Sequence, residues 1–399
     1  MESNMQAPAA PQGLPGETTT TGERPLAIRF TGSGSEYFRI WIVNLLLSIV
    51  TLSLYRPWAK VRRLRYFYAN TLVDGHAFDF HGNPWKMLRG YLLVGVMLVA
   101  YSAAGRFSAT AALVALVILA VLWPALLRAS MQFRLGNTSW RGLRLRFNGS
   151  LAGAYRGMLP LFIPALAIGA LRFEIPDPQH PTMAYLAHFY MVMGATLLVA
   201  PLMWWIFKRY QHDNYGLGQW QTRLDVDPGS AYVLGLKLIG VSLLSFLGVA
   251  VIAGILAVVF GVMGGAMGLV HDKRFFFVVG IVVGLLGYLL ALMVPVPYAI
   301  SRSQNLVWGG TRSDAVRFDS HLPFGAVFKL TVKNWLLMLV TLGLYYPFAS
   351  VAFYRLRVES VTPQLSGDLD RLQAQAQAAG TNDASGDFAG DMFGIDIGL

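Results

Sequence analysis

Long runs of apolar residues alternate with shorter polar connections along most of the chain. Six of these runs hold almost no charged side chain, and they lie at 88–104, 109–127, 151–171, 184–207, 238–270 and 275–300. A helix needs about 20 apolar residues to cross the hydrocarbon core of a bilayer. We therefore expect most of these runs to be transmembrane helices.

Two further apolar runs, Ile40–Tyr55 and Trp335–Tyr346, are shorter and are each followed by a proline. Their length is marginal for a full crossing and is typical of a tilted, broken or re-entrant helix. The hydrophobic pattern thus predicts an all-α polytopic membrane protein with about 6–8 transmembrane or re-entrant helices.

The polar connections carry a pattern of their own: a short β-prone run, a turn with glycine and an alternating second run. It occurs at 70–82, 137–149, 214–225 and 305–319, and a half-length copy occurs at 27–32. This is the sequence form of a β-hairpin, so short repeated hairpins are expected on one side of the helices. Internal repetition is common in transporters and also occurs in membrane scaffolds, so it narrows the architecture more than the function.

The composition agrees with a membrane environment. Of the 399 residues, 55% are hydrophobic and 13% are charged, and the mean hydropathy is +0.49. A soluble domain carries about a quarter charged residues, so the composition excludes an ordinary soluble enzyme. The absence of cysteine excludes disulfides, thiolate metal sites and cysteine nucleophiles.

The two ends of the chain differ from the middle. Residues 1–26 are rich in Pro, Gly, Thr and Ala and are expected to be disordered, and residues 361–399 form an acidic, flexible C-terminal tail. The membrane domain with internal repeats is then 27–360. Apolar residues return at 387–399, which predicts a docking peptide for a protein partner, a solvated end without function, or a segment that docks on the basic face of the same chain.

Basic residues concentrate in the connections that contain the predicted hairpins. The segments 56–89, 128–156, 208–237 and 302–333 hold 22 of the 32 Lys and Arg residues. The intervening short loops hold only Arg106, Arg172, Lys273 and Arg274. Because short basic loops stay in the cytoplasm, we expect the hairpins to face the cytoplasm.

One basic residue recurs near the start of each helix that follows a predicted hairpin. These residues are Arg39, Arg89, Arg156, Lys237 and Lys329. Five cations at a similar depth are suited to anionic lipid headgroups or to a small solute that carries phosphate or carboxylate. In the alternative interpretation, each side chain extends independently to the cytoplasmic interface.

The two short apolar runs match each other at a constant offset of 290 residues. Thr51–Ala59 and Thr341–Ala349 share the pattern Thr-Leu-x-Leu-Tyr-x-Pro-aromatic-Ala. Proline removes a backbone donor and disfavours helix in the residue before it, so a bend is predicted in each copy. Freed carbonyls at such a break can line a ligand site, whereas the alternative is an interfacial aromatic belt. The candidate ligand-lining residues are Tyr55, Pro57, Tyr345 and Pro347.

The stretch 36–44, followed by 51–67 and Asn70-Thr71, resembles the YjgN-like family of bacterial inner-membrane proteins, which is classed as a domain of unknown function. The resemblance runs from about Phe30 to Glu359, and the Tyr-x-Pro-Trp-Ala-Lys-Val-Arg stretch is its most specific part. Ser53 stands where the family usually has glycine. The resemblance implies a multi-pass protein of the bacterial inner membrane and supplies no catalytic residues.

Catalytic and metal-binding patterns are missing from the sequence. His76 and His81 share one predicted hairpin but have no acidic or thiol partner at ligand spacing. The long apolar runs contain no Asp or Glu, which disfavours a proton-coupled carrier. We therefore expect no enzyme activity, no cofactor and no bound metal, and we attribute the net charge of +11 to the bilayer rather than to a nucleic-acid partner.

Two functional hypotheses remain. The first is a non-enzymatic inner-membrane protein that binds or passes a small anionic or lipid-like ligand in its cytoplasmic half, with anionic membrane lipids as its partners. The second is a membrane scaffold or assembly factor that does not transport and that binds other proteins through its cytoplasmic hairpins and C-terminal tail.

Overall fold

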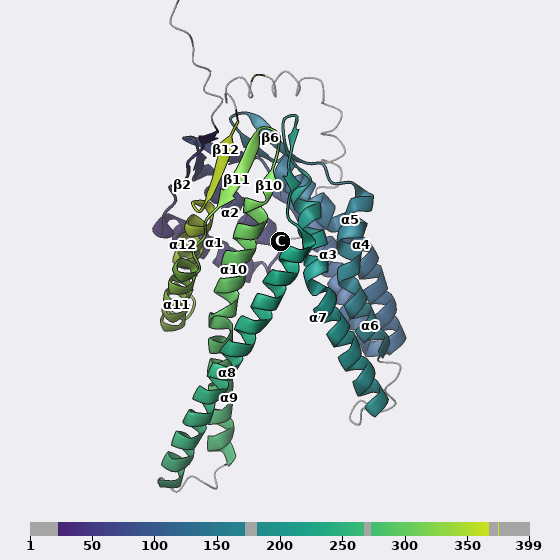
Figure 1. Ribbon diagram of the computed structural model, residues 1–399, viewed down its shortest axis with the longest axis vertical. Helices are drawn as coiled ribbons and strands as arrows, with labels where there is room; N and C mark the ends of the chain where they lie inside the picture. Colours follow the sequence, from purple (N-terminus) through teal and green to yellow (C-terminus); the bar gives the residue numbers. More distant parts are fainter. Residues whose placement is uncertain (1–22, 172–181, 267–272, 367–373, 375–399) are drawn as a thin grey trace, which may run out of the picture.

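The computed structural model describes residues 23–171, 182–266, 273–366 and 374. Long helices descend from a group of short strands at one end of the molecule (Figure 1). Residues 1–22 of the N-terminal tail, most of the acidic tail with its 387–399 segment, and the loop residues Arg172 and 267–272 lie outside the described residues.

Six helical segments among the described residues are long and apolar enough to cross a membrane. They comprise α3 (Pro84–Phe107), α4 (Ala109–Gly136), α5 (Leu151–Met158) with η1 (Leu159–Phe162) and α6 (Ile163–Leu171), α7 (Met183–His212), α8 (Pro228–Ala266), and α9 (Lys273–Met293) with α10 (Pro295–Gly309). The six long apolar runs of the sequence fall on these segments. The expected polytopic membrane protein is therefore confirmed.

The two shorter runs form helical hairpins. In the first, α1 (Gly34–Val50) is followed by α2 (Arg56–Ala69), and in the second, α11 (Phe324–Val340) is followed by α12 (Tyr346–Val358). The two helices of each hairpin pack against each other. In both hairpins the chain therefore returns to the strands from which it came.

The strands form two antiparallel sheets, so the expected all-α class is too narrow. The strands are β1 (Arg24–Pro25), β2 (Ile28–Phe30), β3 (Thr71–Val73), β4 (His76–Phe80), β5 (Thr138–Trp140), β6 (Leu143–Phe147), β7 (Tyr215–Leu217), β8 (Trp220–Gln221), β9 (Arg223–Leu224), β10 (Thr311–Arg312), β11 (Val316–Ser320) and β12 (Val361–Leu365). One sheet has the order β2-β3-β4-β5-β6-β7-β8 and the other β1-β12-β11-β10-β9. β1 and β12 extend the sheets a few residues beyond the 27–360 limits.

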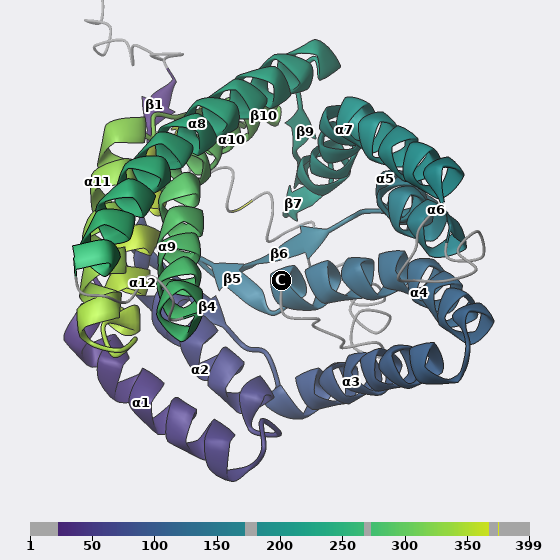
Figure 2. The same cartoon turned by 90° about the horizontal axis from the view of Figure 1, so that it is seen from below.

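The two sheets together make a closed circuit of strands. β1 continues into β2 through Leu26 and Ala27, and β8 continues into β9 through Thr222, so each pair of adjacent strands joins the two sheets. β12, near the C-terminal end of the described chain, pairs with β1, where Arg24 lies opposite Leu365. The helices close in the same way, because α12 packs against α1 (Figure 2).

An apolar core fills the inner side of this circuit. Its buried residues are Leu26, Val73, Trp140 and Leu365, and partly buried neighbours from other strands pack against them, namely Ile28, Phe78, Leu145, Leu217 and Val316. Arg29, Arg144 and Arg317 are exposed on the same strands. This alternation of apolar and basic positions is the period-2 pattern of a half-buried strand.

The Asn-Thr pairs of the hairpin pattern end the helices. The Nδ2 groups of Asn70 and Asn137 donate to the carbonyls of Tyr66 (2.8 Å) and Phe133 (2.7 Å), four residues earlier. The hydroxyl of Thr71 does the same with Phe67 (2.7 Å). The Tyr66 and Phe133 carbonyls also accept from the backbone amides of Asn70 and Asn137, so the side chains strengthen the last turn of each helix.

The predicted start of the fourth hairpin at Asn305 is wrong. Asn305 lies inside α10, and the strand begins at Thr311, whose hydroxyl donates to the Val307 carbonyl at 2.7 Å. Gly310 occupies the cap position that asparagine holds in the first two copies. The helix therefore runs through the segment that the sequence pattern assigned to the first strand.

Three polar contacts join α12 to the N-terminal segment beside the β1–β12 pair. The Phe30 amide donates to Oε1 of Glu359 (2.9 Å), and Nη2 of Arg355 donates to the Gly32 carbonyl (2.7 Å). The hydroxyls of Thr71 and Tyr354 lie 3.0 Å apart. The closure is thus made by side chains as well as by strand pairing.

Closure of the strand circuit is testable because the chain has no cysteine of its own. Pro25 and Gln364 are Cα partners in the β1–β12 pair, and directly paired antiparallel residues lie within the Cα range that disulfides span. We expect the double variant Pro25→Cys/Gln364→Cys to form a disulfide under mild oxidation, seen as a shift on a non-reducing gel. The control pair Pro25→Cys/Gln221→Cys joins the two different sheets and should not react; equal crosslinking of both pairs would contradict the closure.

Candidate functional site

The five predicted helix-start cations all lie on the sheet side of the helices. Each is exposed and lies near the start of a helix that follows a strand, and the set is Arg39 on α1, Arg89 on α3, Arg156 on α5, Lys237 on α8 and Lys329 on α11. None of the five forms a hydrogen bond or ion pair within the described part of the chain. Their charges are therefore open to a partner from outside the fold.

The five cations are spread around the ring of helices. Their helices alternate with others along the ring, as the view from below shows (Figure 2). The arrangement places one basic side chain in each sector at the sheet end. It makes a belt of separate positive charges rather than one cluster.

One of these cations borders an open groove on α11. The groove is lined by Phe328, Lys329, Val332, Lys333, Leu336 and Leu337. Lys329 and Lys333 are exposed and lie one helical turn apart, in the first half and near the middle of α11, whereas Leu336 and Leu337 lie one turn further from the sheets. A pair of cations above an apolar surface matches an anionic headgroup with its acyl chain. Lys333 did not enter the sequence-based set, although its i+4 spacing from Lys329 is a readable signal.

The Tyr-Pro breaks lie at the far ends of the hairpins, away from the cations. Tyr55 caps the start of α2 and is half-buried, Pro57 is buried in its first turn, and Tyr345 and Pro347 take the same places in α12. At 1.5 Å per residue, the helical stretch from Arg39 to Val50 alone spans about 16 Å. The nine predicted residues therefore do not form a single site.

The predicted bend is a complete reversal of the chain. In the first hairpin the Thr51 hydroxyl donates to the Leu47 carbonyl (2.7 Å) and accepts from the Tyr55 amide (3.0 Å). Leu52 and Ser53 adopt positive φ values of 48° and 72°. Positive φ is unfavourable for residues with a side chain, which accounts for Gly343 at the matched position of the second copy.

The second hairpin repeats this turn nearly bond for bond. The Thr341 hydroxyl donates to the Leu337 carbonyl (2.6 Å) and accepts from the Tyr345 amide (3.0 Å), and Leu342 and Gly343 have φ values of 50° and 89°. Tyr345 stacks on Phe348 with ring centroids 5.4 Å apart, as Tyr55 stacks on Trp58 at 5.9 Å. The pattern shared by the two copies, which lie 290 residues apart in the chain, thus encodes a helix reversal.

Each hairpin also buries an asparagine without a hydrogen-bond partner for its side-chain oxygen. Asn44 on α1 is 7% exposed and Asn334 on α11 is 5% exposed, and the Oδ1 atom of each accepts no hydrogen bond. An unpaired buried acceptor destabilises a fold by about 1–3 kcal/mol. Sequence comparison of the two copies pairs these residues, but only the structure shows that both are buried.

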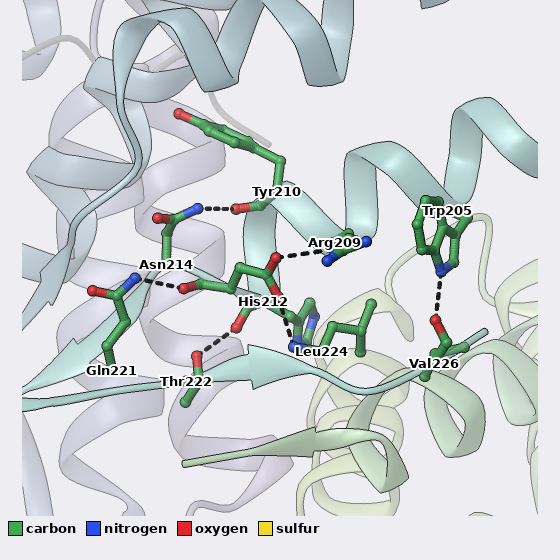
Figure 3. Close-up of polar contacts among 10 residues, drawn as sticks. Trp205, Arg209, Tyr210, His212, Asn214, Gln221, Thr222, Leu224 and Val226 are labelled. Atoms are coloured by element: carbon green, nitrogen blue, oxygen red, sulfur yellow. Dashed lines mark hydrogen bonds and ion pairs between the residues drawn. The ribbon is translucent and has the colours of Figure 1, made fainter. Parts of the chain in front are cut away.

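A hydrogen-bond network orders the third hairpin, where the chain passes from one sheet to the other (Figure 3). Asp213 follows α7, and its carboxylate accepts from the Leu224 amide (2.7 Å) and from Nε of Arg209 (3.2 Å). Its backbone carbonyl accepts from the Gln221 side chain (2.8 Å). Burial raises the pKa of the neighbouring Tyr215 to about 12, so this phenol stays neutral. The network is structural in character.

His212 links this network to the second sheet. Its Nδ1 lies 2.9 Å from the Thr311 hydroxyl, which already donates to the Val307 carbonyl. The hydrogen-bond pattern therefore assigns the proton to Nδ1 of His212. Among the described residues, no group of three or more His, Cys, Asp or Glu side chains could hold a metal ion.

Loss of one hydroxyl should destabilise a hairpin turn. In Thr341→Val the Tyr345 amide loses its acceptor. We therefore expect the free energy of unfolding to fall by about 1–3 kcal/mol, measured as a lower unfolding midpoint in detergent. Thr341→Ser keeps the hydroxyl and should stay close to the original midpoint. Equal midpoints for the two variants would show that the hydroxyl bond is not needed.

Removal of the unpaired side-chain oxygen of Asn44 should instead stabilise the fold. In Asn44→Leu the buried Oδ1 is replaced by an apolar group of similar size, and we expect the free energy of unfolding to rise by about 1–3 kcal/mol. Asn137→Leu, which removes a satisfied side chain, should lower it. A decrease for Asn44→Leu as large as that for Asn137→Leu would mean that the amide has a partner in the membrane.

Comparison with known proteins places the chain in a family. Residues 25–392 match the family model described as "Bacterial protein of unknown function (DUF898)". The chain is 25% identical to the inner membrane protein YjgN of Salmonella typhimurium over 86% of this chain and 89% of that protein. It is also 26% identical to YjgN of Escherichia coli O157:H7 over 55% of this chain and 57% of that protein, and 31% identical to YjgN of Escherichia coli K12 over 35% of each. No solved structure matches.

These matches and the six apolar helices show that the protein is a multi-pass protein of the bacterial inner membrane. The chain belongs to the YjgN-like family of bacterial membrane proteins of unknown function.

Proposed function

We propose that the protein binds anionic membrane lipids at its cytoplasmic half. The observation that carries this proposal is the groove on α11, where Lys329 and Lys333 stand at the sheet end of an apolar surface formed by Val332, Leu336 and Leu337. A phospholipid has the same order of parts, with a charged headgroup above apolar chains. The groove therefore offers matching contacts to both ends of one lipid.

The charge distribution supports a binding surface at the cytoplasmic leaflet. The connections that form the sheets hold most of the Lys and Arg residues, and short basic connections remain in the cytoplasm. The anionic lipids of that leaflet attract each nearby Lys or Arg by about 1 kcal/mol. Lys329 and Lys333 together thus contribute about 2 kcal/mol to the attraction, and Arg39 lies at the matched position of the neighbouring hairpin.

Binding is a better match than proton-coupled transport. The described parts of the six candidate spans contain no Asp or Glu, and proton relays in membranes generally use such carboxylates. The proposed role is therefore lipid binding without proton-coupled transport. The rival hypothesis, a scaffold that binds proteins through its hairpins and tail, predicts no dependence on the two lysines of the groove.

Lipid retention measures this directly. We expect purified Lys329→Ala/Lys333→Ala to keep several-fold less bound anionic phospholipid than the unaltered protein in native mass spectra recorded from mixed anionic and zwitterionic lipid. Retention of zwitterionic lipid should not change. Arg106→Ala is the control, because Arg106 is exposed at the opposite end of α3, and it should retain the full amount.

Equal anionic-lipid retention in the double variant and the control would overturn the proposal. Crosslinking to other proteins, with and without residues 387–399, would then test the scaffold hypothesis.

A further inference from the structure

We propose that α1–α2 and α11–α12 are re-entrant hairpins whose tips end inside the hydrocarbon core, covered by lipid acyl chains. The tips are defined as Val50–Leu54 and Val340–Leu344. This inference concerns how the protein sits in the bilayer and is independent of lipid binding at the α11 groove.

The exposed side chains of both tips are apolar, and Arg56 is exposed just after the first tip. Leu52 and Leu342 are 88% and 92% exposed, and Val50 and Val340 are each 79% exposed. Apolar surface in water is unfavourable by about 25 cal/mol per Å², and no other part of the described chain covers these four side chains. Acyl chains are the partner whose chemistry fits them.

The backbone of both tips is also prepared for a medium without water. Every amide from Thr51 to Arg56 donates within its own hairpin, to carbonyls at 2.6–3.2 Å and, for Tyr55, to the Thr51 hydroxyl at 3.0 Å. The next residue, Pro57, has no amide hydrogen. The amides from Thr341 to Tyr346 are bonded in the same way, and Pro347 follows them.

Pairing of backbone amides is a requirement in hydrocarbon, where each unsatisfied backbone group costs several kcal/mol. In water the solvent would satisfy these groups. Two turns separated by 290 residues in the sequence meet the requirement with the same bonds. The Thr-Leu-x-Leu-Tyr-x-Pro pattern therefore encodes a chain reversal that is stable inside the bilayer.

The length of the helices sets the depth of the tips. From Arg39, near the sheet end of α1, to Leu52 the helical rise amounts to about 20 Å. The hydrocarbon core is about 30 Å thick, so a tip that starts at the cytoplasmic interface passes the middle and ends about 10 Å before the other side. α11 and α12 run in the same direction as α8 and α9 and end well before them (Figure 1).

The two hairpins are neighbours in the ring. α1 packs against α12, and Trp41 on α1 lies beside Tyr346 on α12 with ring centroids 6.1 Å apart. They form one sector of four short helices between α3 and α10 (Figure 2). In this sector the protein reaches past the middle of the bilayer, and lipid fills the rest of the far leaflet beneath the tips.

Single cysteines can locate the tips because the chain has none of its own. Leu54→Cys and Leu344→Cys report on the tips, since both side chains are about half exposed and neither has positive φ. Phe107→Cys marks the end of α3 opposite the sheets, and Asp314→Cys marks an exposed turn between β10 and β11. Each variant is treated with a membrane-impermeant maleimide in spheroplasts and in inside-out vesicles.

We expect Phe107→Cys to react only in spheroplasts, Asp314→Cys only in inside-out vesicles, and the two tip variants in neither. A bimane attached to each tip cysteine under permeant conditions should be quenched more by lipids with a nitroxide deep in the acyl chain than by lipids with a nitroxide on the headgroup. Tip labelling in spheroplasts at the rate of Phe107→Cys would show a full crossing. Labelling in inside-out vesicles at the rate of Asp314→Cys, or stronger quenching by the headgroup nitroxide, would place the tips in water or at the interface, and either result would overturn the proposal.

Discussion

Hydrogen bonding of the backbone is the constraint on which this structure depends. Within a bilayer no water is available to amides and carbonyls, so chain segments there must pair all their polar groups internally. The long helices meet this requirement through their own ladders. The tips at 50–54 and 340–344 pair their amides within the turn, with a threonine hydroxyl as one acceptor and a proline after the last paired amide. The strands, whose edges leave amides and carbonyls unpaired, are gathered at the basic end of the molecule, where water is present. The same rule thus explains the position of both the helices and the sheets.

Closure of the circuit follows from the need to limit strand edges. β1 and β2 are adjacent in the chain but belong to different sheets, and so are β8 and β9, so the edges of the two sheets meet at these points. β1, β8 and β9 have only two residues each, and such short edges offer little surface for pairing with another chain. The β1–β12 pair joins residues more than three hundred positions apart, and contacts of such separation form slowly. β12, the last strand of the described residues, is therefore the one that completes the ring.

The sequence predicted well what depends on length and period. The six long spans and the short β-hairpins follow from apolar run length and alternation of residues. Closure by β1 was beyond prediction, because a strand of two residues has no readable period. The positive φ of Leu52 was equally hidden, since leucine gives no signal for a left-handed turn, whereas Gly343 in the second copy does. The start of the fourth hairpin was predicted too early, at Asn305, because Trp-Gly-Gly at 308–310 resembles a strand and turn. In the structure these residues form the end of α10. The cations and the Tyr-Pro pairs do not form one site, because the length of α1 and α11 separates them along the membrane normal.

The proposed lipid groove and the proposed re-entrant tip lie on the same helix, and their dimensions agree. Lys329 lies near the sheet end of α11 and Lys333 near its middle, and Leu342 lies just beyond its other end. The rise from Lys329 to Leu342 is about 20 Å, which passes the middle of a hydrocarbon core about 30 Å thick. A helix that stops before the far interface presents apolar surface to the whole of the cytoplasmic leaflet. A lipid whose headgroup is held by the two lysines would therefore have acyl chains that lie along the protein over their full length. In a sector built from crossing helices this match would be lost, because the protein surface would continue through the second leaflet.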